Sequence, residues 1–126
     1  MPDENEKIYD IRERAFQFAV RIVKLCRYLE SKTKVSRVLI EQLLAAGTSV
    51  GANLQEAGSG ETDKDFIHKN AISLKEARES RYWLRLIPAS YELEPDIARG
   101  ISDLATEANE LSLIIAKIIV NKKKTT

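Results

Sequence analysis

The stretch "IYDIRERAFQFAVRIVKLCRYLE", residues 8–30, carries the hydrophobic period that decides the fold. Its apolar residues recur at alternating spacings of three and four, which places them on one face of an α-helix. That face is formed by Ile8, Ile11, Ala15, Phe18, Ile22, Leu25 and Leu29. The basic side chains of Arg14, Arg21, Lys24 and Arg27 are expected on the opposite face. The spacing therefore predicts a long amphipathic helix over residues 8–31.

Three further segments show helical periods. Residues 95–121 repeat the single stripe and begin with Pro95, which the first turn of a helix tolerates well. Residues 34–57 carry two neighbouring stripes: Leu39, Leu43, Ala46, Val50 and Asn53, and beside them Ile40, Leu44, Gly47, Gly51 and Leu54. Residues 63–87 are predicted to bury Phe66, Ile67, Ala71, Leu74, Ala77 and Leu84, with Pro88 marking the helix end. Four helices with short connections predict a single all-α domain over residues 1–126, an up-down-up-down antiparallel four-helix bundle.

The glycine-rich stretch "GANLQEAGSGETDKDF", residues 51–66, resembles a phosphate-binding loop at first sight. Such a loop needs a strand before its glycines, whereas a predicted helix precedes them here. The stretch also lacks the glycine-lysine-serine or glycine-lysine-threonine ending. We interpret it as a connector in which Gly58 or Gly60 takes a left-handed conformation and ends one helix. Thr62 and Asp65 then form a capping box that opens the next helix.

Composition indicates a folded protein without a membrane span. The chain has 126 residues, of which 44% are hydrophobic and 31% charged, as in ordinary globular domains. The longest apolar run, residues 111–120, is about half the length a bilayer requires. The acidic N-terminus lacks the order of a secretory signal, and Cys26 stands alone at an apolar helical position. We therefore expect a cytoplasmic protein with a buried thiol and no membrane contact.

The distribution of carboxylates and histidine argues against a catalytic or metal site. The pairs Glu76 with Glu79 and Glu107 with Glu110 have helical spacing, and helical bundles can hold di-metal centres. Those centres need a histidine three residues after a glutamate on two helices, and His68 is the only histidine. Cys26 lacks any visible feature that would stabilise a thiolate. We expect no enzymatic activity, no metal and no cofactor.

Charge is zoned along the chain although the net charge is only +1. Residues 11–37 hold eight basic and two acidic side chains, and residues 38–116 hold seven basic and thirteen acidic ones. Two interpretations are open: a polyanion-binding face, or basic and acidic helices lying side by side. The candidate nucleic-acid contacts are Arg12, Arg14, Arg21, Lys24, Arg27, Lys122, Lys123 and Lys124. The near-neutral total charge and the lack of a base-reading motif weigh against nucleic acid.

Residues 72–86 offer a candidate oligomer interface. Ile72 and Trp83 are eleven positions apart, nearly in line on a helix, and lie away from the predicted core stripe. A monomer is expected to leave them exposed, so that with Leu86 and the second stripe of residues 34–57 they form an interface patch. The alternative is that a thick bundle interior covers them.

Polar residues near the turn at residues 58–62 suggest a structural network. A single asparagine in an apolar seam can fix helix register and partner number. We expect Asn53 and Glu56 to hydrogen-bond with a basic or hydroxyl group on a neighbouring helix. Glu76 and Glu79 are the other acidic candidates.

The segments "GTSVGANLQEA" (47–57) and "KDFIHKNAISLKEARESRYWLRLI" (64–87) carry a family resemblance. They resemble the four-helix-bundle family encoded in intervening sequences of bacterial large-subunit ribosomal RNA genes. The matching positions are Asn53, Glu56, Phe66, Lys69, Glu76, Glu79, Tyr82, Trp83 and Leu84. Many members have a proline where this chain has Gly51, and a basic loop where it has "GSGETDKD".

The resemblance implies a small bundle that self-associates, since ring-shaped pentamers are known in the family. One branch serves as a nucleic-acid-binding partner of a reverse transcriptase, while most members have no established activity. We therefore expect a homo-oligomeric protein-interaction scaffold or adaptor. The alternative is an accessory protein that binds RNA or DNA through the basic face of its first helix.

Overall fold

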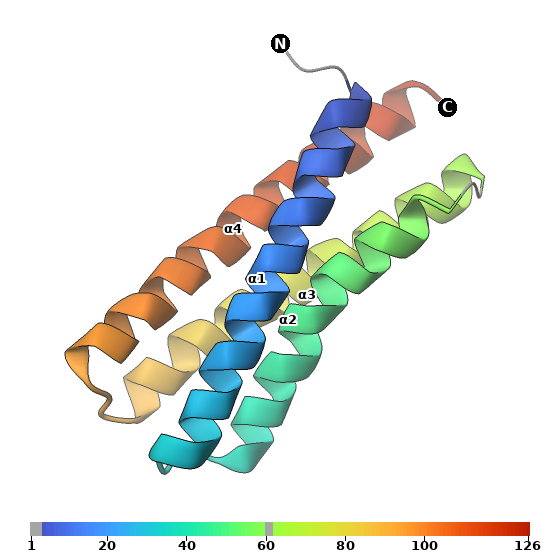
Figure 1. Ribbon diagram of the computed structural model, residues 1–126. Coiled ribbons are helices and arrows are strands. Elements are labelled where there is room, and N and C mark those ends of the chain that lie inside the picture. The colour runs from blue at the N-terminus through green and yellow to red at the C-terminus, as the bar shows by residue number, and fades with distance from the viewer. Residues whose placement is uncertain (1–3, 60–61) are drawn as a thin grey trace.

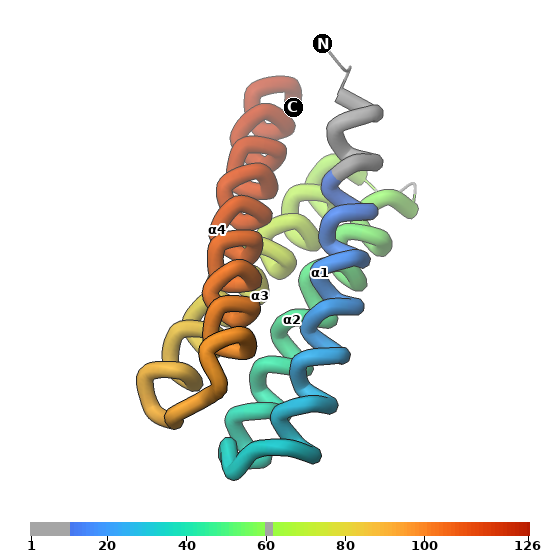
Figure 2. Tube along the Cα trace, turned by 60° about the vertical axis from the view of Figure 1, so that its left-hand side comes forward, coloured from blue at the N-terminus to red at the C-terminus, as the bar shows by residue number. Residues whose placement is uncertain are grey.

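Four long helices make up the computed structural model, which describes residues 4–59 and 62–126, with side chains from residue 11 onward. They are α1 (Glu4–Lys32), α2 (Arg37–Ala57), α3 (Asp63–Ser90) and α4 (Pro95–Lys124), and the described residues contain no strand. Both α1 and α3 pack against α2 and α4. The end of α4, the end of α2 and the beginning of α3 lie at one end of the molecule (Figures 1 and 2), and α1 begins at the same end (Figure 1). The predicted antiparallel four-helix bundle is confirmed.

The core forms where the apolar stripes meet. Phe18 and Ile22 of α1 and Leu111 and Ile115 of α4 are almost fully buried. In α2 both predicted stripes contribute, because Leu43, Ala46 and Val50 are buried and so are Ile40, Gly47 and Leu54. The expectation that the second stripe adds to an exposed patch is therefore wrong for most of that stripe.

The buried face of α3 is more polar than predicted. Its buried residues are Asn70, Ser73, Ala77, Ser80, Leu84 and Ile87, whereas Ala71 is exposed and Leu74 is only half-buried. The Ser73 hydroxyl donates to the carbonyl oxygen of Val50 on α2 at 2.7 Å, and the Ser80 hydroxyl donates to Glu76 O at 2.8 Å. Serine hydroxyls satisfied in this way can be buried at little cost. The predicted stripe is therefore only partly right: Ala77 and Leu84 are buried as expected, but polar residues, which a pattern of apolar residues does not mark, complete the buried face.

Five helix ends differ from the predicted ones. Helix α1 spans Glu4–Lys32 rather than 8–31, α4 ends at Lys124 rather than at residue 121, and the end of α3 and the start of α2 are shifted as well. Pro88 lies inside the last turn of α3, which continues to Ser90, because proline removes only one backbone donor from a helix that ends shortly afterward. Helix α2 begins at Arg37 rather than at residue 34. The residues before it are tied into the loop, since Val35 N donates to the Thr33 hydroxyl and Ser36 N donates to Tyr91 Oη at 3.1 Å.

The α2–α3 connection is built partly as predicted. The Thr62 hydroxyl accepts a hydrogen bond from Asp65 N at 3.2 Å and caps α3. Of the two candidates for a left-handed conformation, Gly58 does not take one, because its φ is −88°. Its N–H instead bonds to Gln55 O at 3.1 Å in a tightened last turn of α2. Gly60, the other candidate, lies outside the described residues.

Helices α1 and α2 are in close contact. A Cβ atom added to Gly47 would lie 2.7 Å from Cγ2 of Ile22, so only glycine fits there without a shift. Farther along, Cys26 is 3% exposed, and its Sγ lies 3.8 Å from the carbonyl oxygen of Ile40, to which it donates. Burial, with a smaller effect from Glu30, raises the pKa of this thiol to about 11. The predicted buried thiol is confirmed.

Candidate functional site

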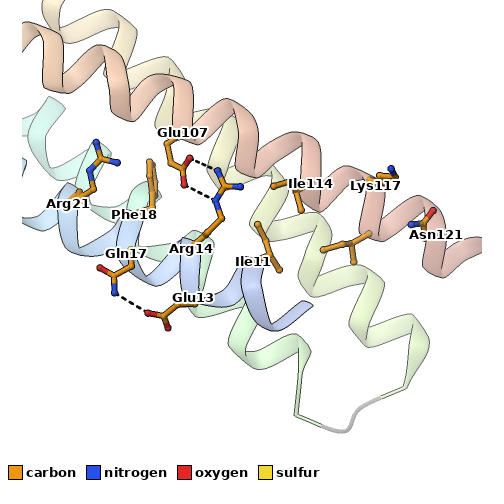
Figure 3. A pocket seen from close by; sticks show the side chains of 11 residues that line it. Ile11, Glu13, Arg14, Gln17, Phe18, Arg21, Glu107, Ile114, Lys117 and Asn121 are labelled. Atoms are coloured by element: carbon orange, nitrogen blue, oxygen red, sulfur yellow. Dashed lines mark hydrogen bonds and ion pairs between the residues drawn. The ribbon is translucent and has the colours of Figure 1, made fainter. Parts of the chain in front are cut away.

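A groove of about 630 Å³ runs between α1 and α4, the least closely packed pair of neighbouring helices. Apolar side chains from both helices line it: Ile11, Phe18, Ile114 and Ile118. Figure 3 shows Ile11, Phe18 and Ile114 between the two helices. We call this feature the α1–α4 groove.

Arg14 bridges the α1–α4 groove. Its Nε and Nη2 donate to the two carboxylate oxygens of Glu107 at 3.1 and 2.6 Å (Figure 3). Nη2 also donates to Glu110 at 2.8 Å. The hydrogen bond to Glu107 is the largest cause of a raised pKa for Arg14. The prediction that Arg14 lies opposite the core is therefore wrong, because the acidic side chains of α4 hold it at the seam.

Polar side chains form the rim of the groove. Gln17 Nε2 donates to Glu13 Oε1 at 3.1 Å, while Arg21 and Lys117 are exposed at the edge. Neither cation forms an ion pair with any described residue. An apolar floor with a charged rim is suited to an amphipathic helix.

The other predicted nucleic-acid contacts are divided between different surroundings. The Arg12 guanidinium packs where a side chain on Gly58 would lie, and its Nε is buried without a partner among the described residues. Lys122 pairs with Asp63 at 3.2 Å and lies over the Phe66 ring at 5.2 Å from its centroid. The remaining five, Arg21, Lys24, Arg27, Lys123 and Lys124, are exposed. The eight residues therefore do not form a single free basic face.

The predicted interface residues are less accessible than expected. Ile72, Trp83 and Leu86 are each half-buried within one chain, and Trp83 packs against the core. The Trp83 indole also meets Tyr82 edge-on, with ring centroids 5.2 Å apart. The expectation that a monomer exposes Ile72 and Trp83 is wrong, and their role in assembly stays a prediction.

The predicted polar network is only partly assembled. Glu56 pairs with Lys69 of α3 at 3.3 Å, but the Asn53 amide donates to Ser49 O of its own helix at 2.8 Å. Glu76 is half-buried, and burial, followed by repulsion from Glu79, raises its pKa. The structure thus joins α2 to α3 through Glu56 and leaves Asn53 out of that contact.

A second groove, of about 430 Å³ between α3 and α4, contains residues that the sequence analysis missed. It is lined by Arg78, Arg81 and Arg85 on α3, with Tyr82 beside them and Leu113 on α4. The signal was present in the sequence, since arginines spaced by three and four residues share one helix face. We call this feature the arginine groove.

The described residues contain no group of three or more histidine, cysteine, aspartate or glutamate side chains placed to hold a metal ion. In the same part of the chain, no helix has the length and hydropathy that a membrane crossing requires.

A family model described as 23S rRNA-intervening sequence protein matches residues 7–117. The chain belongs to this family. A solved structure from the S23 ribosomal protein family of Bacteroides thetaiotaomicron, a protein with unknown function, is similar to it with a TM-score of 0.78. That protein is 33% identical, and the similarity covers 86% of this chain and 97% of the other. No curated protein matches the chain.

Membership in the 23S rRNA-intervening sequence protein family confirms the resemblance found at residues 47–57 and 64–87. The similar protein of solved structure has unknown function, so the family relationship assigns the fold and no activity. A specific function of this chain therefore depends on the surfaces of its bundle.

Proposed function

We propose that this member of the family is a non-enzymatic interaction module that self-associates through the α1–α4 groove. The observation that carries the proposal is the floor of that groove, where Ile114 and Ile118 of α4 remain partly exposed beside the buried Ile11 and Phe18. Covering apolar surface is the main favourable term in most protein association. Arg14 and Glu107 are already paired at the seam, so a partner helix need not neutralise them.

A second copy of the chain can supply a matching ridge. Phe16 is 57% exposed and Val23 is 37% exposed on α1, and with Val20 between them they are spaced as one helical stripe. In this arrangement the ridge of one copy enters the groove of the next. Such an unlike-to-unlike contact closes into a ring when the rotation between copies allows it, and the resemblance favours a pentamer.

Size-exclusion chromatography with light scattering tests the proposal on the full chain and three matched variants. Ile118→Glu places a charge in the groove and Phe16→Glu places one on the ridge. Val38→Glu places the same charge on an apolar residue of α2 that is 65% exposed and belongs to neither surface. We expect the unmodified chain and Val38→Glu to assemble. The other two variants are expected to have a lower molar mass in solution and an unchanged helical circular dichroism spectrum. A monomeric unmodified chain, or dissociation by Val38→Glu alone, would contradict the proposal.

The second candidate function is binding of RNA or DNA by α1. It is favoured by Arg21, Lys24 and Arg27, which are exposed and form no ion pair with the described residues. Such a face binds phosphates without sequence preference, with an affinity that falls steeply as salt rises. Replacing the three with glutamine is expected to abolish salt-sensitive retention of mixed RNA and DNA. Equal retention by the variant would exclude this face.

A further inference from the structure

The arginine groove holds three cations that are unpaired among the described residues. Arg78, Arg81 and Arg85 are exposed, and none of them forms an ion pair or hydrogen bond with any described residue. The positive charge of Arg14, by contrast, is already matched by glutamates of α4. The three guanidinium groups are therefore free to meet an external anion.

The three arginines form a row along α3, and the spacing of this row matches the spacing of side chains on a second helix. Arg78 and Arg85 are seven residues apart, which corresponds to about 10.5 Å along the axis at 1.5 Å per residue. A second helix with carboxylates at spacings of three and four presents the same repeat. Arginine binds carboxylate through two parallel hydrogen bonds, which makes such pairs specific as well as favourable.

The opposite wall of the groove is neutral. Helix α4 contributes Asn109, Ser112 and Leu113, and Leu113 is 63% exposed. Tyr82, which is 55% exposed, lies beside the arginines on α3 and is held edge-on by Trp83. One side of the groove thus offers cations, while Leu113 and Tyr82 offer apolar surface.

We infer that the arginine groove binds an acidic amphipathic helix of a partner protein. The glutamates or aspartates of that helix pair with Arg78, Arg81 and Arg85, and its apolar residues cover Leu113 and Tyr82. The site lies on the α3 side of α4, away from the α1–α4 groove, so it does not depend on the proposed self-association.

The chemistry favours a protein helix over nucleic acid. The cations form one row facing a neutral wall, and an exposed leucine gains most from an apolar partner. A phosphate backbone would meet Arg78, Arg81 and Arg85 on one side only and would leave Leu113 in water.

Fluorescence anisotropy with three labelled probes tests this inference on the full chain. The first probe is a helical peptide of about 20 residues, long enough for several turns, with glutamates in one row and leucines beside them. The second has the same composition in an order that scatters the glutamates around the helix. The third is a single-stranded RNA. The variant R78Q/R81Q/R85Q is compared with R21Q/K24Q/R27Q, which removes the same charge from α1.

We expect the ordered peptide to bind the unmodified chain, and R78Q/R81Q/R85Q to weaken binding about tenfold or more. The matched variant R21Q/K24Q/R27Q is expected to leave the affinity within about twofold, because removing distant charges alters only the long-range field. The inference would be overturned if the ordered peptide did not bind, or if the scattered peptide bound equally well. It would also be overturned if both variants lost affinity equally, or if RNA bound more tightly through the same arginines.

A fluorophore attached to Leu113→Cys provides a second reading that does not depend on removing arginines. Cys26 is buried and does not compete for the label. The emission of the label is expected to change when the ordered peptide is added and to stay constant with the scattered one. An unchanged emission while anisotropy reports binding would place the peptide elsewhere and overturn the inference.

Discussion

Helix α1 meets its two neighbours in unlike ways. Toward α2 the seam is closed: Gly47 leaves no room beside Ile22, and Cys26 lies against the backbone of Ile40. Toward α4 the seam is open: its floor is apolar, and Arg14 reaches across it to pair with Glu107. We call these the closed seam and the open seam.

The two seams differ in the size of the residues that meet there, and small residues allow two helices to pack closely. Gly47 and Gly51 remove side-chain bulk from α2, so the backbone of α1 comes near. At the open seam α4 presents the larger side chains of Ile114, Ile118 and Glu107. The closed seam is therefore fully packed, while the open seam leaves Ile114 and Ile118 half-buried.

Truncating one isoleucine on each seam should give the largest contrast. Ile22→Ala removes a fully buried side chain and is expected to lower the free energy of unfolding by about 2–5 kcal/mol. Ile118→Ala removes a half-buried side chain and is expected to cost about 1 kcal/mol. Urea unfolding of both variants as monomers measures the difference, and equal losses would mean that the seams do not differ.

Raising the pH should weaken the closed seam through Cys26. The native thiol keeps its proton up to a pKa of about 11, whereas the unfolded thiol ionises near 9.0. The stability that Cys26 contributes is therefore fully present below pH 9 and is lost as pH rises toward 11. At about 1.4 kcal/mol per pKa unit, the unmodified chain should lose about 2 kcal/mol more than Cys26→Ala over this range. Urea titrations measure the free energy of unfolding of both proteins at each pH. Equal losses in the two proteins would contradict the raised pKa of the buried thiol.

Adding one methyl group should change the stability in opposite directions at the closed seam and at an open surface position. Gly47→Ala is expected to destabilise the chain by about 1 kcal/mol, because overpacking against Ile22 outweighs the gain in helix propensity. Gly100→Ala, where nothing lies within 4 Å of the added atom, should stabilise by about 0.5–1 kcal/mol. Thermal unfolding of the two variants shows whether each substitution raises or lowers the stability. Stabilisation by both substitutions would mean that Ile22 can move away from the added methyl group.

Breaking the ion pair of the open seam should have the smallest effect. A double-mutant cycle of Arg14→Gln and Glu107→Gln is expected to give a coupling energy of at most about 1 kcal/mol, because both side chains are partly exposed. The coupling should fall as salt is added. A larger, salt-independent value would show that this contact holds the two helices together.

The fold could be predicted from periodicity because each helix has to bury one stripe, and four matched stripes leave few arrangements. The buried face of α3 could not, since Asn70, Ser73 and Ser80 are polar and their burial depends on hydrogen-bond partners. The conformation of Gly58 also escaped prediction, because an ordinary turn can end a helix without a left-handed residue.

The surfaces were harder to predict than the core. The sequence identified Arg14 as basic, but its partner lies about ninety residues away, at Glu107 and Glu110 on a helix whose position requires the fold. The prediction that Trp83 is exposed was wrong for a related reason, because a residue away from the main stripe can still pack at the edge of the core. The arginine groove was readable from its spacing, but its neutral wall on α4 was not.

The open seam is the surface through which we propose that copies of the chain associate. Gln17→Cys, in a Cys26→Ala background, places one thiol on the rim of the α1–α4 groove, and its alkylation rate can be followed as protein concentration rises. We predict that the rate falls over the same concentration range in which light scattering shows the mass to increase. A rate that stays constant while the mass increases would show that copies associate elsewhere and would contradict the account.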